Sequence, residues 1–341
     1  MKKASLALNL LASKLTGRQI PFHVTFEITD TCNLSCEYCL LKHEESRRTM
    51  FDAARGLALI DEMAAAGTVK VNLTGGEPLL HPAIDAFVER IRSHGIDCFL
   101  NTNGRLVERH LETIGKLSAM NVSLDGDAAS HDAARGKGSQ AYAVNALRIA
   151  KDKGIPRLMT AVIGKHNIDQ LDYLVGMARS LQAGIVILYL IQPRGTDGSA
   201  FALPEEEGRK LFVEIARRKR AGEPFVYSPQ AMKIVSEWPL HLSTDHVLRK
   251  DAGLLPTKPV QCHAGTYYCA VFADGTVSPC CISKGFVANE PNVNTMTFKE
   301  ALARIRRHGC YACNVPSVVD MNMMFSLHPL AIRNALAVYR Y

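Results

Sequence analysis

Residues 22–39 read FHVTFEITDTCNLSCEYC, a stretch in which a strand pattern runs directly into three cysteines. Residues 22–28 alternate apolar and polar side chains and are rich in β-branched and aromatic types, which predicts a half-buried strand ending at Thr29-Asp30. Cys32, Cys36 and Cys39 follow in a C-x3-C-x2-C spacing. The loop that leaves this strand therefore carries three closely spaced thiols.

The strand-then-helix order of this first unit repeats along the chain as far as residue 220. Six such units with short connections predict parallel strands, right-handed crossovers and an outer layer of helices. We expect an α/β fold, a partial (β/α)6 TIM-like barrel, although a doubly wound open sheet would give the same periodicity. The later predicted strands are residues 69–73, 97–101, 120–124, 158–163 and 185–191, and the predicted helices are residues 51–66, 84–94, 108–117, 142–153, 168–181 and 205–220.

Changes in composition divide the chain into five parts. We expect an amphipathic helix over residues 1–19, the barrel over 20–220 and a proline-punctuated linker over 221–258. A small cysteine-rich C-terminal module follows at 259–318, and a C-terminal helix at 319–341. The leucines and lysines of the first helix fit packing against the barrel, or docking on an anionic membrane surface.

Composition indicates a globular chain in a reducing compartment. The 341 residues are 47% hydrophobic and 21% charged, a balance that can bury a core. No apolar run approaches the roughly 20 residues that span a bilayer, and we expect no signal peptide and a cytoplasmic location. The net charge of +7 includes basic runs at 217–220 and 304–307, which are typical of solvated helix faces. Ten clustered cysteines then favour metal binding over disulfides.

The first cysteine loop fits a four-iron cluster with one open position. Three thiolates leave one iron without a protein ligand, and such an iron can bind a substrate or cofactor. Zinc is the alternative, but structural zinc sites favour four ligands in paired C-x2-4-C hooks.

Polar motifs follow the next predicted strands at the same end. Thr74-Gly75-Gly76-Glu77-Pro78 closes the second strand, where two glycines admit close backbone approach and Glu77 offers an acceptor; a simple turn is the alternative. Asn101–Gly104 and Ser123–Gly126 end the third and fourth strands. Because carboxyl ends of parallel strands meet at one edge, these motifs predict an active site there. Gln192 and Arg194 after the sixth strand could touch substrate, or Arg194 could be a surface arginine.

These motifs resemble the radical S-adenosylmethionine (SAM) superfamily over roughly residues 20–195, with Tyr38 in the aromatic position of the family's cysteine signature. The resemblance implies a [4Fe–4S] cluster on Cys32, Cys36 and Cys39, with SAM chelated to the free iron and cleaved to a 5′-deoxyadenosyl radical. It also implies a SAM site. Its expected members are Tyr38, Gly75, Gly76, Glu77, Pro78, Asn101, Asn103, Ser123 and Asp125.

A second cysteine group lies between residues 262 and 313. Residues 262–280 predict a β-hairpin with an Asp274-Gly275 turn. The segment resembles the SPASM and twitch extensions of radical SAM enzymes, which implies one auxiliary [4Fe–4S] cluster; zinc fits the same ligand count. The expected ligands are Cys262, Cys280, Cys310 and Cys313.

Three cysteines remain outside both sets. Cys98, Cys269 and Cys281 fit small buried side chains, but Cys269 or Cys281 could replace an auxiliary ligand. Either could instead give a hydrogen atom to a substrate radical, as a catalytic residue of an epimerase.

The resemblance narrows the activity to a radical reaction on an unidentified substrate. An auxiliary cluster favours oxidation of that substrate, and epimerisation is the other outcome. We expect a small-molecule substrate, with a peptide as the alternative, and a flavodoxin- or ferredoxin-type reductant. No nucleic acid is expected, because no RNA-binding motif accompanies the positive charge. A non-enzymatic iron–sulfur binding or sensing protein remains the other class.

Overall fold

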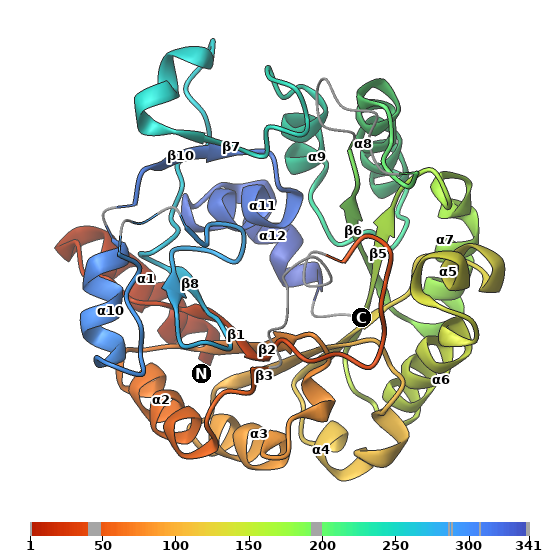
Figure 1. The fold of residues 1–341 in the computed structure, drawn as a ribbon. Coiled ribbons are helices and arrows are strands. Elements are labelled where there is room, and N and C mark those ends of the chain that lie inside the picture. Colours follow the sequence, from red (N-terminus) through yellow and green to blue (C-terminus); the bar gives the residue numbers. More distant parts are fainter. Residues whose placement is uncertain are drawn as a thin grey trace.

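The architecture comes from a computed structural model that describes residues 2–39, 49–191, 200–285, 287, 289–306 and 308–338. Six parallel strands form the body of the sheet, as the sequence predicted. The sheet curves into an arc with helices along its outer side, which is the form of a partial barrel and not of an open sheet covered on both faces (Figure 1). The strands are β1 (His23–Thr29), β2 (Lys70–Gly75), β3 (Asp97–Thr102), β4 (Ala119–Ser123), β5 (Arg157–Ile163) and β6 (Gly184–Tyr189).

The outer helices follow the strands in alternation. Short 3-10 turns precede several of them: η2 (Pro78–Leu80), η3 (Val107–Arg109) and η4 (Ile168–Gln170). The helices are α2 (Ala53–Ala65), α3 (Ile84–Ser93), α4 (Leu111–Gly115), α6 (Ser139–Asp152), α7 (Leu171–Leu181) and α8 (Glu205–Arg220).

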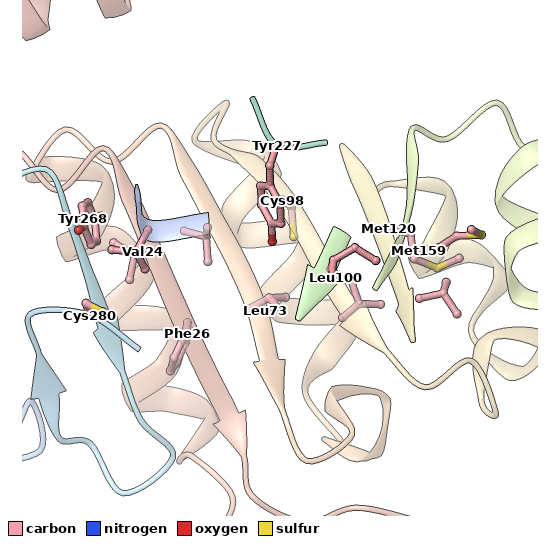
Figure 2. Close-up of a cluster of buried hydrophobic side chains, with 14 of the residues drawn as sticks. Val24, Phe26, Leu73, Cys98, Leu100, Met120, Met159, Tyr227, Tyr268 and Cys280 are labelled. Atoms are coloured by element: carbon pink, nitrogen blue, oxygen red, sulfur yellow. The ribbon is translucent and has the colours of Figure 1, made fainter. Parts of the chain in front are cut away.

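Alternation along each strand separates the core from the barrel interior. On β1, Val24 and Phe26 are completely buried, whereas Thr25 and Glu27 between them keep partial exposure. The Phe26 ring meets Phe51 edge-on with 4.9 Å between centroids. Figure 2 shows this buried row continuing across the sheet through the neighbouring strands. The apolar face therefore packs under the helices, and the more polar face lines the inside of the arc.

The cysteine-rich segment extends this same sheet. Strands β8 (Tyr268–Val271) and β9 (Val277–Ser278) form the expected antiparallel hairpin, with Gly275 at φ 87° in its turn. β8 also pairs in parallel with β1, so the sheet order is β6-β5-β4-β3-β2-β1-β8-β9. The C-terminal module is thus hydrogen-bonded to the first barrel strand.

The expected linker over 221–258 contains regular structure. Helix α9 (Pro229–Ser236) is followed by β7 (His246–Leu248) and the 3-10 helix η5 (Arg249–Leu254). β7 pairs antiparallel with β10 (Cys310–Cys313). This segment therefore supplies a strand beside two of the predicted ligand cysteines.

The C-terminal segment is two helices instead of the single one expected. α11 (Pro316–Phe325) ends before Leu327, which adopts φ 62°, and α12 (Pro329–Val338) starts with a proline. A proline lacks the N–H needed inside a helix, so it fits the first position of a new one. Both helices lie inside the arc of the sheet (Figure 1).

Three further helices complete the described chain. α1 (Lys2–Thr16) and α10 (Phe298–Ile305) pack beside the hairpin end of the sheet, and Thr297 and Glu300 form a capping box on α10. α5 (Ala128–Arg135) was not predicted, because its eight residues are too few to show a periodicity. No helix in the described ranges is long and apolar enough to cross a membrane.

Truncation of the Phe26 side chain tests the packing of β1. Phe26→Ala should lower the free energy of unfolding by about 3–5 kcal/mol, because it removes a fully buried ring from between Phe51 and Phe87. Urea unfolding measures the loss. Leu15→Ala is the matched control, since Leu15 is 81% exposed on α1 and its change should stay within about 0.5 kcal/mol.

Candidate active site at the carboxyl ends of the strands

The three cysteines of the first group lie on the loop that leaves β1. Cys32 is exposed, Cys36 and Cys39 are half-buried, and Cys39 N–H donates to Cys36 O at 3.1 Å in a tight turn. In the described chain, no three His, Cys, Asp or Glu side chains are gathered tightly enough to hold a metal ion as they stand. The donor set nevertheless fits a cluster, because three partly accessible thiols share one short loop beside polar strand ends.

Gly75 and Gly76 hold the end of β2 against that loop. A Cβ on Gly75 would lie 1.9 Å from Thr29 O, and one on Gly76 would lie 2.3 Å from Thr31 O. Gly76 N–H donates to Thr29 O and Glu77 N–H donates to Thr31 O, both at 2.8 Å. The glycine pair therefore lets two backbones meet where any side chain would separate them, and fixes the start of the cysteine loop.

Glu77 braces the structure internally, in addition to the acceptor role in the SAM site that stays a prediction. Its side chain is completely buried, and its carboxylate accepts hydrogen bonds from Leu79 N–H at 3.1 Å, Thr102 O–H at 2.9 Å and Asn103 N–H at 2.8 Å. These contacts join the end of β2 to the end of β3. Pro78 follows in the first position of η2 and is buried.

The polar residues of β3 and β4 point into the barrel interior. Asn121 donates to Asn101 Oδ1 at 3.2 Å and accepts from Thr160 O–H at 2.8 Å, which forms a polar row across β3, β4 and β5. Ser123 is half-buried and stands opposite Thr160 in register. This row gives the interior hydrogen-bonding groups on the side where the cysteine loop lies.

Asn103 makes the link from β3 to the first cysteine. Its side-chain amide donates to Asn33 Oδ1 at 2.8 Å and lies 3.9 Å from Cys32 Sγ. The orientation of Asn103 is fixed in turn by Glu77 through the backbone. Asn103 therefore positions the cysteine loop.

Asp125 is also more deeply engaged than the sequence indicated. It is completely buried and accepts from Arg135 through Nε at 2.7 Å and Nη2 at 3.1 Å, from Val162 N–H at 2.9 Å and from the Tyr38 hydroxyl. Burial would raise the pKa of Asp125, but the Arg135 charge and these hydrogen bonds outweigh it and hold that pKa below its usual value. Asp125 therefore anchors the cysteine loop through Tyr38.

Sequence reasoning missed the residues that complete this anchor. Arg135 lies on α5 with its guanidinium 5.4 Å from the centre of the Tyr38 ring. His131 Nδ1 accepts from Asp125 N–H at 3.0 Å, and Asn167 donates to Asp125 O at 2.8 Å. Asp127, whose side chain caps the start of α5, is the sequence signal that could have predicted this helix.

The second cysteine group gathers beside the hairpin. The Cys262 and Cys310 sulfurs are hydrogen-bonded to each other, and this contact lowers the pKa of Cys262 to about 6. Cys313 lies close enough to Cys262 and Cys280 to interact electrostatically with both. These pairwise contacts link the four predicted ligands, which come from three segments, although no three of them in the described chain are gathered tightly enough to hold a metal ion as they stand. Four thiols are nevertheless a donor set that fits a cluster or zinc.

The remaining cysteines occupy different surroundings. Cys269 stands in register with Val24 on the helix-covered face and is 2% exposed, so it has no access to the barrel interior. This position does not favour Cys269 as a hydrogen-atom donor to substrate, a role that stays a prediction. Cys98 is buried on β3. Cys281 is exposed, contrary to the expected buried side chain, and is hydrogen-bonded to Cys280 of the second group.

The expected substrate contacts of Gln192 and Arg194 lie outside the described residues.

The structure defines a class of protein, a partial barrel with its site at the carboxyl edge of the sheet. Its marks are the concave face, the three-thiol loop after β1 and the braced strand ends. Comparison with known proteins agrees with it. Residues 26–178 match the model of the Radical SAM superfamily.

Two curated relatives match different lengths of the chain. Mycofactocin maturase MftC of Mycobacterium ulcerans is 32% identical over 186 residues, covering 52% of this chain and 50% of the relative. AdoMet-dependent heme synthase of Nitratidesulfovibrio vulgaris is 24% identical over 277 residues, covering 75% of this chain and 72% of the relative. The chain thus spans about half the length of the maturase.

Solved structures share the fold at low sequence identity. Streptococcus suis SuiB bound to S-adenosylmethionine superposes with a TM-score of 0.66 at 16% identity, over 85% of this chain and 67% of that protein. SuiB bound to its precursor peptide SuiA superposes with a TM-score of 0.64 at 15% identity, over 91% of this chain and 74% of that protein. Residues 26–178 therefore form a domain of the radical SAM superfamily.

Removal of the Arg135 charge tests the buried anchor. Arg135→Gln should cost about 3–5 kcal/mol of unfolding free energy, because it leaves the Asp125 carboxylate buried and unpaired. The double variant Arg135→Gln/Asp125→Asn should recover part of that loss, and chemical unfolding of the wild type, Arg135→Gln, Asp125→Asn and the double variant gives the coupling. Equal costs for the single and double variants would contradict the anchor.

The Glu77 brace should show in the pH dependence of stability. Burial raises the pKa of Glu77 to about 7 against the hydrogen bonds from Asn103, Leu79 and Thr102. Because the pKa of Glu77 is higher in the folded protein, this carboxyl group contributes to the free energy of unfolding in full below its unfolded pKa of about 4.3. That contribution is lost as pH rises through 7. From pH 5 to 7.5, unfolding free energy should therefore fall more in the wild type than in Glu77→Gln, by on the order of 2 kcal/mol. Parallel pH profiles would rule this out.

Proposed function

We propose that the chain is a radical SAM enzyme that oxidises its substrate with the help of an auxiliary cluster. Cys32, Cys36 and Cys39 would hold the first [4Fe–4S] cluster, with SAM on its open iron. When bound, this pair supplies a 5′-deoxyadenosyl radical that takes a hydrogen atom from the substrate. The cofactors would be two [4Fe–4S] clusters and SAM, and an electron carrier of the flavodoxin or ferredoxin type would serve as reductant.

One observation carries the proposal. The first cysteine loop follows the carboxyl end of β1, and the hairpin of the second group is hydrogen-bonded to the same strand from His23 to Phe26. Both cysteine groups therefore adjoin the interior face that carries Asn101, Asn121 and Thr160. A substrate in that interior would have a radical source on one side and an electron acceptor nearby.

The residues of this chain have positioning roles in the proposed reaction. Glu77 and Asn103 fix Cys32 from β2 and β3. Asp125 and Arg135 fix the Tyr38 segment from β4 and α5. The polar row across β3 to β5 would orient SAM and substrate by hydrogen bonds, with Ser123 and Asn101 as the first candidates. Such positioning places reacting atoms without a search through other geometries.

The proposed outcome is oxidation, with epimerisation as the second candidate. Cys269 faces the outer helices, which favours Cys281 of the two candidate hydrogen-atom donors. Cys281 adjoins Cys280, where it can serve as a cluster ligand as well as a donor. An oxidation needs no donor thiol, only an acceptor for one electron.

The substrate class is a small molecule or a peptide. The names of relatives include both classes, since one is a heme synthase and another is a PqqA peptide cyclase. SuiB, which shares the fold, has been captured with a precursor peptide. A peptide substrate, or the maturation of a ribosomal peptide, therefore gains support over the small-molecule preference that the sequence alone gave.

Release of 5′-deoxyadenosine tests the proposed chemistry. Oxygen-free reconstituted protein with SAM and dithionite should release 5′-deoxyadenosine and contain about eight irons, as two cubane clusters require. The variant with Cys32, Cys36 and Cys39 all changed to Ala should release none and keep about four irons. Cys98→Ala is the matched control, since Cys98 is buried on β3 and should leave both values unchanged.

Two results would contradict the proposal. Wild-type protein that binds iron but never cleaves SAM would indicate an iron–sulfur binding or sensing protein. About four irons with one zinc per chain would assign zinc to the second group and remove the auxiliary electron acceptor.

A further inference from the structure

A basic pocket opens next to the second cysteine group. It has a volume of about 440 Å³ and lies where the end of α1, the start of η5, the segment before β8 and the end of α10 converge. No Asp or Glu of the described residues lines it. Its lining includes four cations and one of the proposed cluster ligands: Lys14, Arg18, Arg249, Arg306 and Cys262.

These cations are available to an external anion. Arg18, Arg249 and Arg306 are exposed, and Arg306 Nη2 donates to Gly17 O at 2.8 Å, a neutral acceptor. Lys14 Nζ lies 5.5 Å from the centre of the Tyr267 ring. Arg304, which lines the adjoining hollow together with Arg306, is exposed as well. Cations from distant parts of the sequence are therefore gathered on one surface with neutral contacts.

The pocket reaches the second cysteine group directly. Cys262 in its wall is hydrogen-bonded to Cys310. Arg249 N–H donates to Gly309 O at 2.7 Å. The neighbours of these two residues, Leu248 and Cys310, are partners in the β7–β10 pair. An anionic protein that covers this surface would come close to whatever the four cysteines hold.

The pocket also lies away from the barrel mouth. Ile20 N–H donates to Thr266 O at 3.1 Å just before β1 and β8 begin, so the pocket adjoins the amino ends of these strands. The first cysteine loop follows the opposite end of β1, a strand of seven residues that spans roughly 23 Å. A bulky partner could therefore dock here while substrate occupies the interior.

We infer that this basic pocket is the docking site of an acidic, flavin-bearing electron-carrier protein of the flavodoxin type. The inference rests on the proposed function, because it needs an auxiliary cluster to exchange electrons with. One electron leaves the auxiliary cluster and enters the oxidised flavin of the carrier, which takes up one proton from water. Opposite charges steer such encounters and fix their orientation.

Titration of oxidised flavodoxin into the reconstituted full-length chain tests the site by calorimetry. Arg18→Glu/Arg249→Glu/Arg306→Glu should weaken binding at least tenfold at low salt, and wild-type binding should weaken as salt rises. Lys151→Glu/Lys153→Glu/Arg179→Glu is the matched control. It makes the same change of net charge at exposed positions at the end of α6, just after it and on α7, and its affinity should stay within twofold of wild type.

The outcomes separate this inference from the proposed function. Dithionite needs no docking site, so both triple variants should release 5′-deoxyadenosine as wild type does. If the pocket variant loses flavodoxin binding but still releases 5′-deoxyadenosine, the docking site is supported. If the wild type binds flavodoxin but releases no 5′-deoxyadenosine, the docking site still holds and the proposed function fails. Three results would overturn the inference. The first two are equal weakening of binding in both triple variants and unchanged binding in the pocket variant. The third is a chain that does not bind flavodoxin but floats with phosphatidylglycerol vesicles. Should the triple variant not fold, Arg18→Glu alone must weaken binding at least threefold.

Discussion

The pairing of β1 with β8 is the constraint on which the arrangement of both cysteine groups depends. His23 to Phe26 stand in register with Tyr268 to Val271, although the paired residues are 245 positions apart in the sequence. This pairing makes the hairpin of the second group an extension of the barrel sheet. It also decides that Cys269 faces the helices with Val24 while Tyr268 faces the other side. The hydroxyl of Tyr268 lies 3.9 Å from Cys262 Sγ, so the pairing carries directly into the second group.

Buried polar contacts hold the other cysteine loop. Two carboxylates with no exposure, Glu77 and Asp125, collect the backbone and side chains of the strand ends around it. Burying a carboxylate is costly unless hydrogen bonds and charges satisfy it, so each one restricts the loop to a geometry in which its partners stay in place. These contacts fix the barrel edge, where a radical intermediate would have to be held in place. The polar row between Asn101 and Thr160 would then bind ligands.

The sequence predicted the fold well because the periodic signals are local. Strands such as 97–101 and helices such as 205–220 appear within two residues of their predicted bounds, and the partial barrel is confirmed. The roles of Glu77 and Asp125 could not be predicted, because burial and partner choice depend on contacts between strands. Arg135 was missed since α5 is short, and the face of Cys269 was set by a long-range register that no local pattern contains.

Electron paramagnetic resonance of the reduced, oxygen-free protein tests the central claim most directly. If the loop after β1 holds a cluster with an open iron, addition of SAM should change the signal of the wild type, and this SAM-sensitive signal should persist in Cys310→Ala/Cys313→Ala. A spectrum that is indifferent to SAM, or a SAM-sensitive signal that survives replacement of Cys36 by Ala, would contradict the account.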